Sequence, residues 1–235
     1  MTTLEIAVQD IAGVRTALAA GAHRLELCQA LALGGLTPSS ALIGAAVAAA
    51  PAGAVRVLMR PRPGGFVLDA DELAITCADA RRAMDAGAGA IVAGALTESG
   101  AIDLRAVEAL LEASAGSLVF HRAIDACADP VGGAAALAEA GVPELLTSGG
   151  AARAVDGIGT IGEIAVGSPQ LAVIAGGGVR PVDIPQLIAA GARAVHLSAR
   201  VAREDALAGP GGGPSSVDRT DAAIVRAAAA ALAAA

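Results

Sequence analysis

The chain has 235 residues, 55% of them hydrophobic, and a formal net charge of −7. This length suits one α/β domain with a large core, whereas the negative charge and the 1% aromatic content disfavour binding of nucleic acid. No apolar run has the length of a membrane span without an interruption by glycine, proline or charge, so we expect no membrane association.

The basic and sulfur-containing residues exclude or disfavour further classes of protein. All 16 basic residues are arginine, and the chain contains no lysine. Schiff-base catalysis by a lysine is therefore impossible, as is pyridoxal phosphate (PLP) bound in that way. The three cysteines are not in CxxC spacing, which favours a reducing cytoplasm over a disulfide framework.

A phrase made of a helix end, a glycine and an apolar strand recurs along the chain. Its four copies are AGAHRLELC from Ala20, AGAGAIVAG from Ala86, AGVPELLTS from Ala140 and AGARAVHLS from Ala190. Glycine suits the left-handed position just past a helix C-terminus. Each copy therefore marks a junction between a helix and the strand that follows it.

Four other apolar segments alternate with these copies, which predicts eight strands separated by helices. In chain order the strands are expected near residues 4–8, 24–28, 55–60, 90–94, 117–121, 144–148, 171–175 and 194–198. Helix starts are expected at Asp69 or Asp71 and at Asp103. Residues 208–216 predict a flexible loop, and a last helix is expected over about 217–235. The predicted fold is a TIM (β/α)8 barrel of the α/β class, a single domain over residues 1–235.

The repeat also predicts which strand residues point into the barrel. Counted from the repeat glycine, Glu26 and His196 share the fifth position, and Cys28 and Ser198 share the seventh. Because strand side chains alternate between faces, we expect these four to face inward. Glu5 can join Glu26 and His196, which would make an acid–base pair or a metal site. Alternatively, Glu5 is a buried partner of an arginine.

The active site of such a barrel lies at the mouth formed by the loops after the strands. The candidate catalytic residues there are Glu26, His121, Asp125 and His196. A small anionic ligand is expected after strands seven and eight, the usual phosphate site of this fold. The candidate anion-binding residues are Arg60, Arg122, Gly177, Gly178 and Ser198.

Eight strings in order over roughly residues 4–200 resemble the CutC family of so-called copper homeostasis proteins. They are LEI, RLELC, LGGLTPS, VLMRPRPGGF, FHRAID, ELLTSGG, AGGGV and HLSAR. The resemblance implies a TIM barrel, a cytoplasmic location, a homodimer or higher oligomer, and a role in copper handling. It also makes Cys28, in RLELC, a candidate Cu(I) ligand. A lone thiolate is a weak Cu(I) site, and Cys28 can equally be an inert, small apolar residue.

Three hypotheses follow for the function. The first is copper binding in copper homeostasis. The second is a lyase- or isomerase-type barrel enzyme without a Schiff base, acting on a small anionic or sugar-like substrate. The third is a barrel that binds a ligand without catalysis. The acids, imidazoles and guanidiniums expected at the mouth favour the second.

Overall fold

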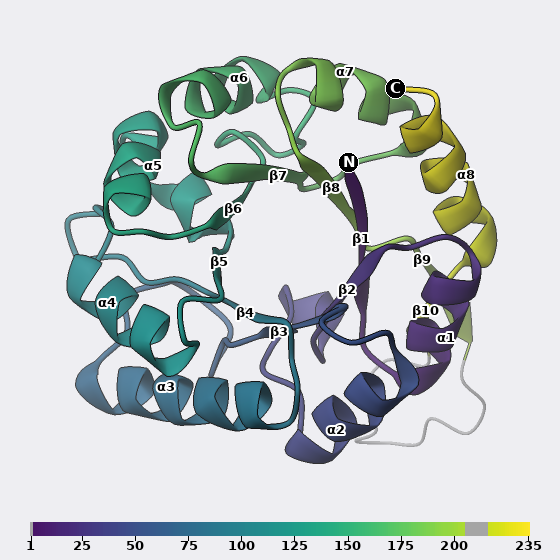
Figure 1. Cartoon of the computed structure of the whole chain (residues 1–235), viewed down its shortest axis with the longest axis horizontal. Helices are drawn as coiled ribbons and strands as arrows, with labels where there is room; N and C mark the ends of the chain where they lie inside the picture. The colour runs from purple at the N-terminus through teal and green to yellow at the C-terminus, as the bar shows by residue number, and fades with distance from the viewer. Residues whose placement is uncertain (1, 205–215) are drawn as a thin grey trace.

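The computed structural model describes residues 2–204 and 216–235, and its main feature is a closed barrel of parallel strands in the order β1 to β8. The barrel closes where β1 pairs with β8, with Glu5 opposite His196. Helices surround the strands on the outside (Figure 1). The TIM barrel expected from the sequence is thus confirmed.

All eight predicted strands are present within two residues of their expected bounds. They are β1 (Thr3–Val8), β2 (Arg24–Leu27), β3 (Val55–Leu58), β4 (Ala90–Ala93), β5 (Leu118–Phe120), β6 (Glu144–Thr147), β7 (Ala172–Gly176) and β8 (Ala194–Leu197). The α-helices are α1 (Ile11–Ala19), α2 (Ser40–Ala49), α3 (Ala70–Asp85), α4 (Leu104–Ala113), α5 (Pro130–Glu139), α6 (Ile158–Gly167), α7 (Ile184–Ala189) and α8 (Ala222–Ala233). Short 3₁₀ turns are η1 (Leu31–Leu33), η2 (Arg122–Ala126) and η3 (Pro181–Asp183).

Local sequence explains where these helices start. Asp69 caps α3 in a reciprocal capping box with Glu72, so Asp71 lies inside the first turn and is not the cap. Asp103 caps α4 by accepting hydrogen bonds from two backbone N–H groups. The helix-to-strand junctions follow the repeat, as the expected left-handed glycines show (φ +82° at Gly141, +102° at Gly191).

The C-terminal region differs from the prediction. Residues 217–220 were expected to open the last helix, but they lie in a strand, β10 (Ser216–Thr220), which pairs antiparallel with β9 (Arg200–Glu204). The helix begins only at Ala222, where Asp221 caps it. The helix therefore starts about five residues later than the composition indicates, because pairing with β9 satisfies the backbone hydrogen bonds of the preceding residues. Apart from Ser216, the predicted loop over 208–216 lies outside the described residues.

Strand side chains sort into two cores, as the alternation predicts. Leu27, Ala93 and Leu197, from the sixth repeat position, pack in the core between barrel and helices. Cys28 lies in the second core with Leu58, among residues that face the barrel interior. Among the described residues, no helix is both long enough and apolar enough to cross a membrane.

Candidate functional site

A cavity of about 550 Å³ opens at the C-terminal mouth of the barrel. All of the predicted site residues except Cys28 line it: Glu26, Arg60, His121, Arg122, Asp125, Gly177, Gly178, His196 and Ser198. The parity argument thus placed Glu26 and His196 correctly, on the inner side of β2 and β8. Their catalytic roles stay predictions.

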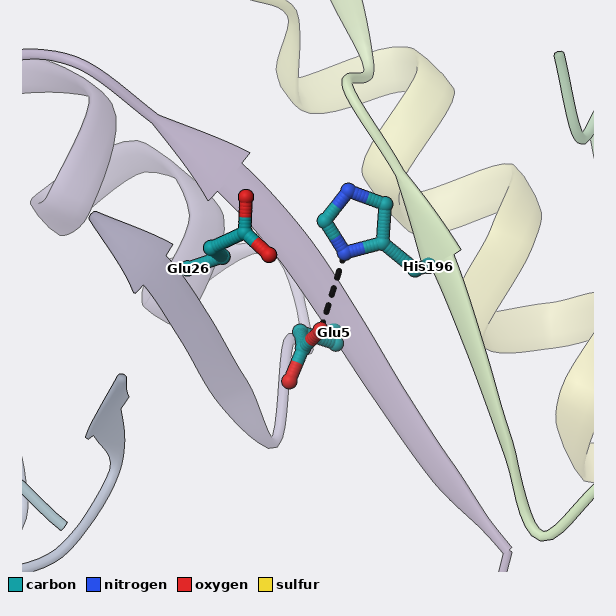
Figure 2. A group of neighbouring side chains, drawn as sticks. All are labelled: Glu5, Glu26 and His196. Atoms are coloured by element: carbon teal, nitrogen blue, oxygen red, sulfur yellow. Dashed lines mark hydrogen bonds and ion pairs between the residues drawn. The ribbon is translucent and has the colours of Figure 1, made fainter. Parts of the chain in front are cut away.

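The floor of the cavity carries a compact group of two carboxylates and one imidazole. Glu5, Glu26 and His196 come from β1, β2 and β8, which are neighbours because β1 lies between the other two. Oε1 of Glu5 lies 2.8 Å from Nδ1 of His196, and the Glu26 carboxylate faces the same ring (Figure 2). The expectation that Glu5 joins the pair is confirmed.

The two carboxyl groups differ in their partners. Burial alone would raise the pKa of Glu5, but the His196 hydrogen bond and the charges of Arg24 and Arg56 outweigh it and lower the pKa to about 2. Arg24 Nε lies 2.6 Å from Glu5 Oε2, so Glu5 is also the arginine partner that the alternative interpretation describes.

Glu26 lacks the hydrogen bonds and close ion pairs that Glu5 has among the described residues. Burial raises its pKa, and within the described part of the chain its Oε2 atom has no hydrogen-bond partner. Burial lowers the pKa of His196, but the charge of Glu26 and the hydrogen bond to Glu5 outweigh it, so the pKa is raised. Glu26 and His196 therefore both hold a proton more tightly than the same groups do in water.

Below this group lies a layer of ion pairs that we did not predict. Glu144 on β6 accepts from Arg56 on β3 at 2.6 Å and from Arg24 on β2 at 3.0 Å. These contacts cross the barrel interior. The repeat held a signal for them, because Arg24 and Glu144 both occupy the third position after their glycines, on the same face as the fifth.

His121 contributes a neutral imidazole to the cavity wall. It is buried, and burial lowers its pKa to about 4. Its Nδ1 accepts a hydrogen bond from the N–H of Ala123, and its ring packs edge-on against Phe66 with centroids 5.0 Å apart. At neutral pH the ring is therefore uncharged, and because Nδ1 accepts from Ala123, Nε2 carries the proton and can donate a hydrogen bond.

Asp125 and Arg122 are tied to each other at the rim. Arg122 Nε lies 2.7 Å from Asp125 Oδ2, and Arg122 Nη2 donates to Ser148 Oγ at 2.9 Å. Asp125 also accepts from the Thr147 hydroxyl at 2.6 Å and from the N–H groups of Ser148 and Gly150. This set of donors favours a loop-organising role for Asp125.

The other anion-site candidates also have structural contacts. Arg60 donates to the carbonyls of Leu33 and Gly64 and lies over the Phe66 ring at 5.5 Å. At Gly177, φ is +113°, and a Cβ there would come within 3.0 Å of Arg122. Glycine at this position suits both the positive φ and the close approach of the Arg122 guanidinium.

Cys28 does not provide a site that suits Cu(I). Its thiol is fully buried with Sγ 3.7 Å from the carbonyl oxygen of Val8, and burial raises its pKa, which keeps it protonated. Cys77 lies on α3 and Cys127 follows η2, both outside the barrel. In residues 2–204 and 216–235, the one group of three possible ligands is the oxygen and nitrogen set of Glu5, Glu26 and His196.

Fold and site together define a (β/α)8 barrel with a carboxylate–imidazole group at the floor of its mouth. The sequence model of the CutC family matches residues 2–201, and the chain belongs to this family. A crystal structure of CutC from Streptococcus agalactiae superposes with a TM-score of 0.78 at 29% identity, covering 84% of this chain and 99% of that one.

Curated relatives match a shorter stretch. A family protein CutC from Vibrio atlanticus is 37% identical over 111 residues, covering 46% of this chain and 44% of the relative. A copper homeostasis protein cutC homolog from Caenorhabditis elegans is 38% identical over 109 residues, with the same coverage of 46% and 44%. In these alignments the chain spans less than half the length of the curated relatives.

Proposed function

We propose that the chain is a barrel enzyme that binds a small anionic or sugar-like molecule in its mouth and catalyses proton transfer on it. The observation that carries the proposal is Glu26, whose buried Oε2 lacks a partner among the described residues and stands beside His196 at the cavity floor. A carboxylate and an imidazole with pKa values raised by their surroundings suit general acid–base catalysis.

The charges beneath the cavity support a proton held between these two groups. Three carboxylates (Glu5, Glu26 and Glu144) face two guanidiniums (Arg24 and Arg56). One proton on the Glu26–His196 pair balances this set. Because an uncompensated buried charge is costly, the pair keeps one transferable proton near neutral pH.

The rim supports the anionic character of the ligand. Gly177 and Gly178 have left-handed φ values of +113° and +58° after β7, and such turns present backbone N–H groups to anions. Ser198, Arg60 and Arg122 lie around the same cavity. With no lysine in the chain, arginine supplies the permanent side-chain cations at the rim.

A titration with inorganic phosphate and small sugar phosphates tests the binding step. A charge-assisted contact contributes on the order of 1.5–3 kcal/mol, so Arg60→Ala and Arg122→Ala should each weaken binding about tenfold or more. Arg82→Ala is the control and should bind normally, since Arg82 is exposed on α3 and, among the described residues, pairs only with Asp79. Equal affinity in all four proteins, or no binding at millimolar ligand, would contradict the anion site.

Solvent deuterium exchange tests the chemical step. NMR of bound sugar phosphates in D₂O should show exchange of a C–H proton next to a carbonyl, and Glu26→Gln should abolish it while leaving binding. Binding without exchange in the unaltered protein would favour the non-catalytic barrel.

Copper binding is the second candidate, favoured by the naming of the Caenorhabditis relative. Cys28 is the one ligand carried over for it, so Cys28→Ser should abolish any Cu(I) binding. Tight, stoichiometric binding that survives this change would contradict a role for the thiol. A cytoplasmic location and a homodimer also remain predictions.

A further inference from the structure

One buried carboxylate oxygen at the cavity floor, Oε2 of Glu26, lacks a positively charged or hydrogen-bonding partner among the described residues. Glu26 is 6% exposed, and its Oε2 has no hydrogen-bond donor among the residues described. An unpaired buried carboxylate is costly unless it is protonated, paired or bound to a metal. In Figure 2 this carboxylate faces the His196 ring, and the Glu5 carboxylate approaches from the adjacent strand.

We propose that Glu5, Glu26 and His196 bind one divalent cation of the Mn²⁺, Fe²⁺ or Zn²⁺ class. One potential ligand atom from each residue lies within 4.8 Å of the other two. Ligand atoms around a tetrahedral ion lie about 3.4 Å apart, because each bond is about 2.1 Å long. The side chains therefore need to close by no more than about 1.4 Å to bind one ion.

The surroundings resemble those of a catalytic metal site. Arg24 holds Glu5 through Oε2, at 2.6 Å, so Oε1 faces the His196 ring, and the ion would replace its hydrogen bond to Nδ1. Partners of this kind orient ligating carboxylates in metalloproteins. Three protein ligands leave coordination positions free, and the cavity lined by Glu26 and His196 gives an outside molecule access to them.

The donor set selects the kind of metal. Two carboxylates and one imidazole suit borderline divalent ions, whereas Cu(I) prefers sulfur ligands and Ca²⁺ and Mg²⁺ prefer oxygen alone. The site therefore differs from the thiol site that a copper role would need. Cys28 contributes nothing to it, since its Sγ contacts the Val8 carbonyl.

The inference deepens the proposed function and rests on it for the identity of the ligand. A cation would replace the proton held by Glu26 and His196 and would polarise an oxygen of the anionic ligand as a Lewis acid. Three carboxylates and two guanidiniums carry one net negative charge, so a divalent ion makes the set positive by one. We therefore expect the ion and a monoanionic ligand to bind cooperatively.

Binding of Mn²⁺ and Zn²⁺ to the full chain, freed of metal by chelation, tests the site. Calorimetry should give one ion per chain, and electron spin echo spectroscopy of bound Mn²⁺ should show one nitrogen ligand. Glu26→Gln should weaken binding at least tenfold, and His196→Asn should remove the nitrogen signal. Glu98→Gln, an exposed acid, is the control and should bind as the unaltered chain does.

Glu26→Gln removes an unpaired buried charge, so it should fold and unfold at a temperature no lower than the unaltered chain. Absence of binding at millimolar Mn²⁺ and Zn²⁺, or unchanged affinity in Glu26→Gln, would overturn the inference. Phosphate titration with chelator present separates the two proposals. Anion binding without metal binding overturns only the metal site, and metal binding without anion binding overturns only the proposed ligand.

Discussion

Single residues at the mouth acquire their chemistry from what surrounds them. Glu5 and Glu26 are both buried carboxylates on neighbouring strands, yet the pKa of Glu5 is lowered and that of Glu26 is raised. The difference arises because Glu5 contacts Arg24, Arg56 and His196, whereas Glu26 lacks such hydrogen bonds in the described chain. Sequence reasoning identified these acids as neighbours of His196. It could not assign the arginines, because they approach from a lower layer of the barrel.

His121 should make stability depend on pH. Its pKa is about 4 in the folded chain against 6.5 as the ordinary value, because burial disfavours the charged ring. As the pH falls below 6.5, the unfolded chain binds a proton first, so stability is present at high pH and is lost towards pH 4. Between pH 8 and pH 5 the loss should be about 2 kcal/mol.

Urea unfolding of the unaltered chain and of His121→Gln at both pH values measures this effect. The other titrating groups, Glu5 and His196 among them, are present in both proteins, so the difference in pH slope isolates His121. Parallel pH profiles would show that His121 is not a neutral buried ring.

At the scale of elements, the repeated helix-to-strand junction could be predicted from the sequence because its cause is local. A glycine past the helix end adopts a left-handed conformation whatever the distant chain does. The same argument failed at the C-terminus, where the pairing of β10 with β9 set the start of α8 at Ala222. Pairing partners separated in sequence are not visible in local composition.

Two of the junction glycines form a matched pair for measurement. Gly141 and Gly191 both have left-handed φ values, but a Cβ at Gly141 meets no atom within 4 Å, whereas one at Gly191 comes within 2.8 Å of the Ala165 Cβ. Gly141→Ala should cost about 1 kcal/mol, from the backbone alone. Gly191→Ala should cost at least about 2 kcal/mol, since overpacking adds to it. Equal losses in chemical denaturation would refute the packing contribution.

At the scale of the whole molecule, the ion layer ties together strands that are not neighbours. Arg56 on β3 and Glu144 on β6 meet across the interior, and Arg24 on β2 joins them. Nearly buried ion pairs add little net stability but are costly to break singly. Removal of one charged group should therefore change the contribution of the others to the free energy of unfolding.

A double-mutant cycle measures that coupling. Glu144→Gln alone should cost about 3 kcal/mol, because among the described residues it leaves Glu5 as the one ion-pair partner of two guanidiniums. Arg56→Met alone should also destabilise, and the double variant should lose at least about 1 kcal/mol less than the two single losses combined. The measurement is urea unfolding at pH 7. Additive losses would mean that the two groups do not interact across the barrel.

The sequence by itself determined the barrel, its eight strands, the inward direction of Glu26 and His196, and the position of the mouth. These follow from glycine placement and from the alternation of side chains, both of which act over a few residues. Only the tertiary structure decided that Arg24, Arg56 and Glu144 meet beneath Glu5. The same holds for the ion pair of Asp125 with Arg122 and its hydrogen bond from Thr147. It also holds for Glu26, whose Oε2 has no hydrogen-bond partner among the described residues. The repeat places Arg24 and Glu144 on the inner face of their strands. Which inward side chains meet depends on how the closed barrel brings distant strands to one level, and the local pattern does not carry that information.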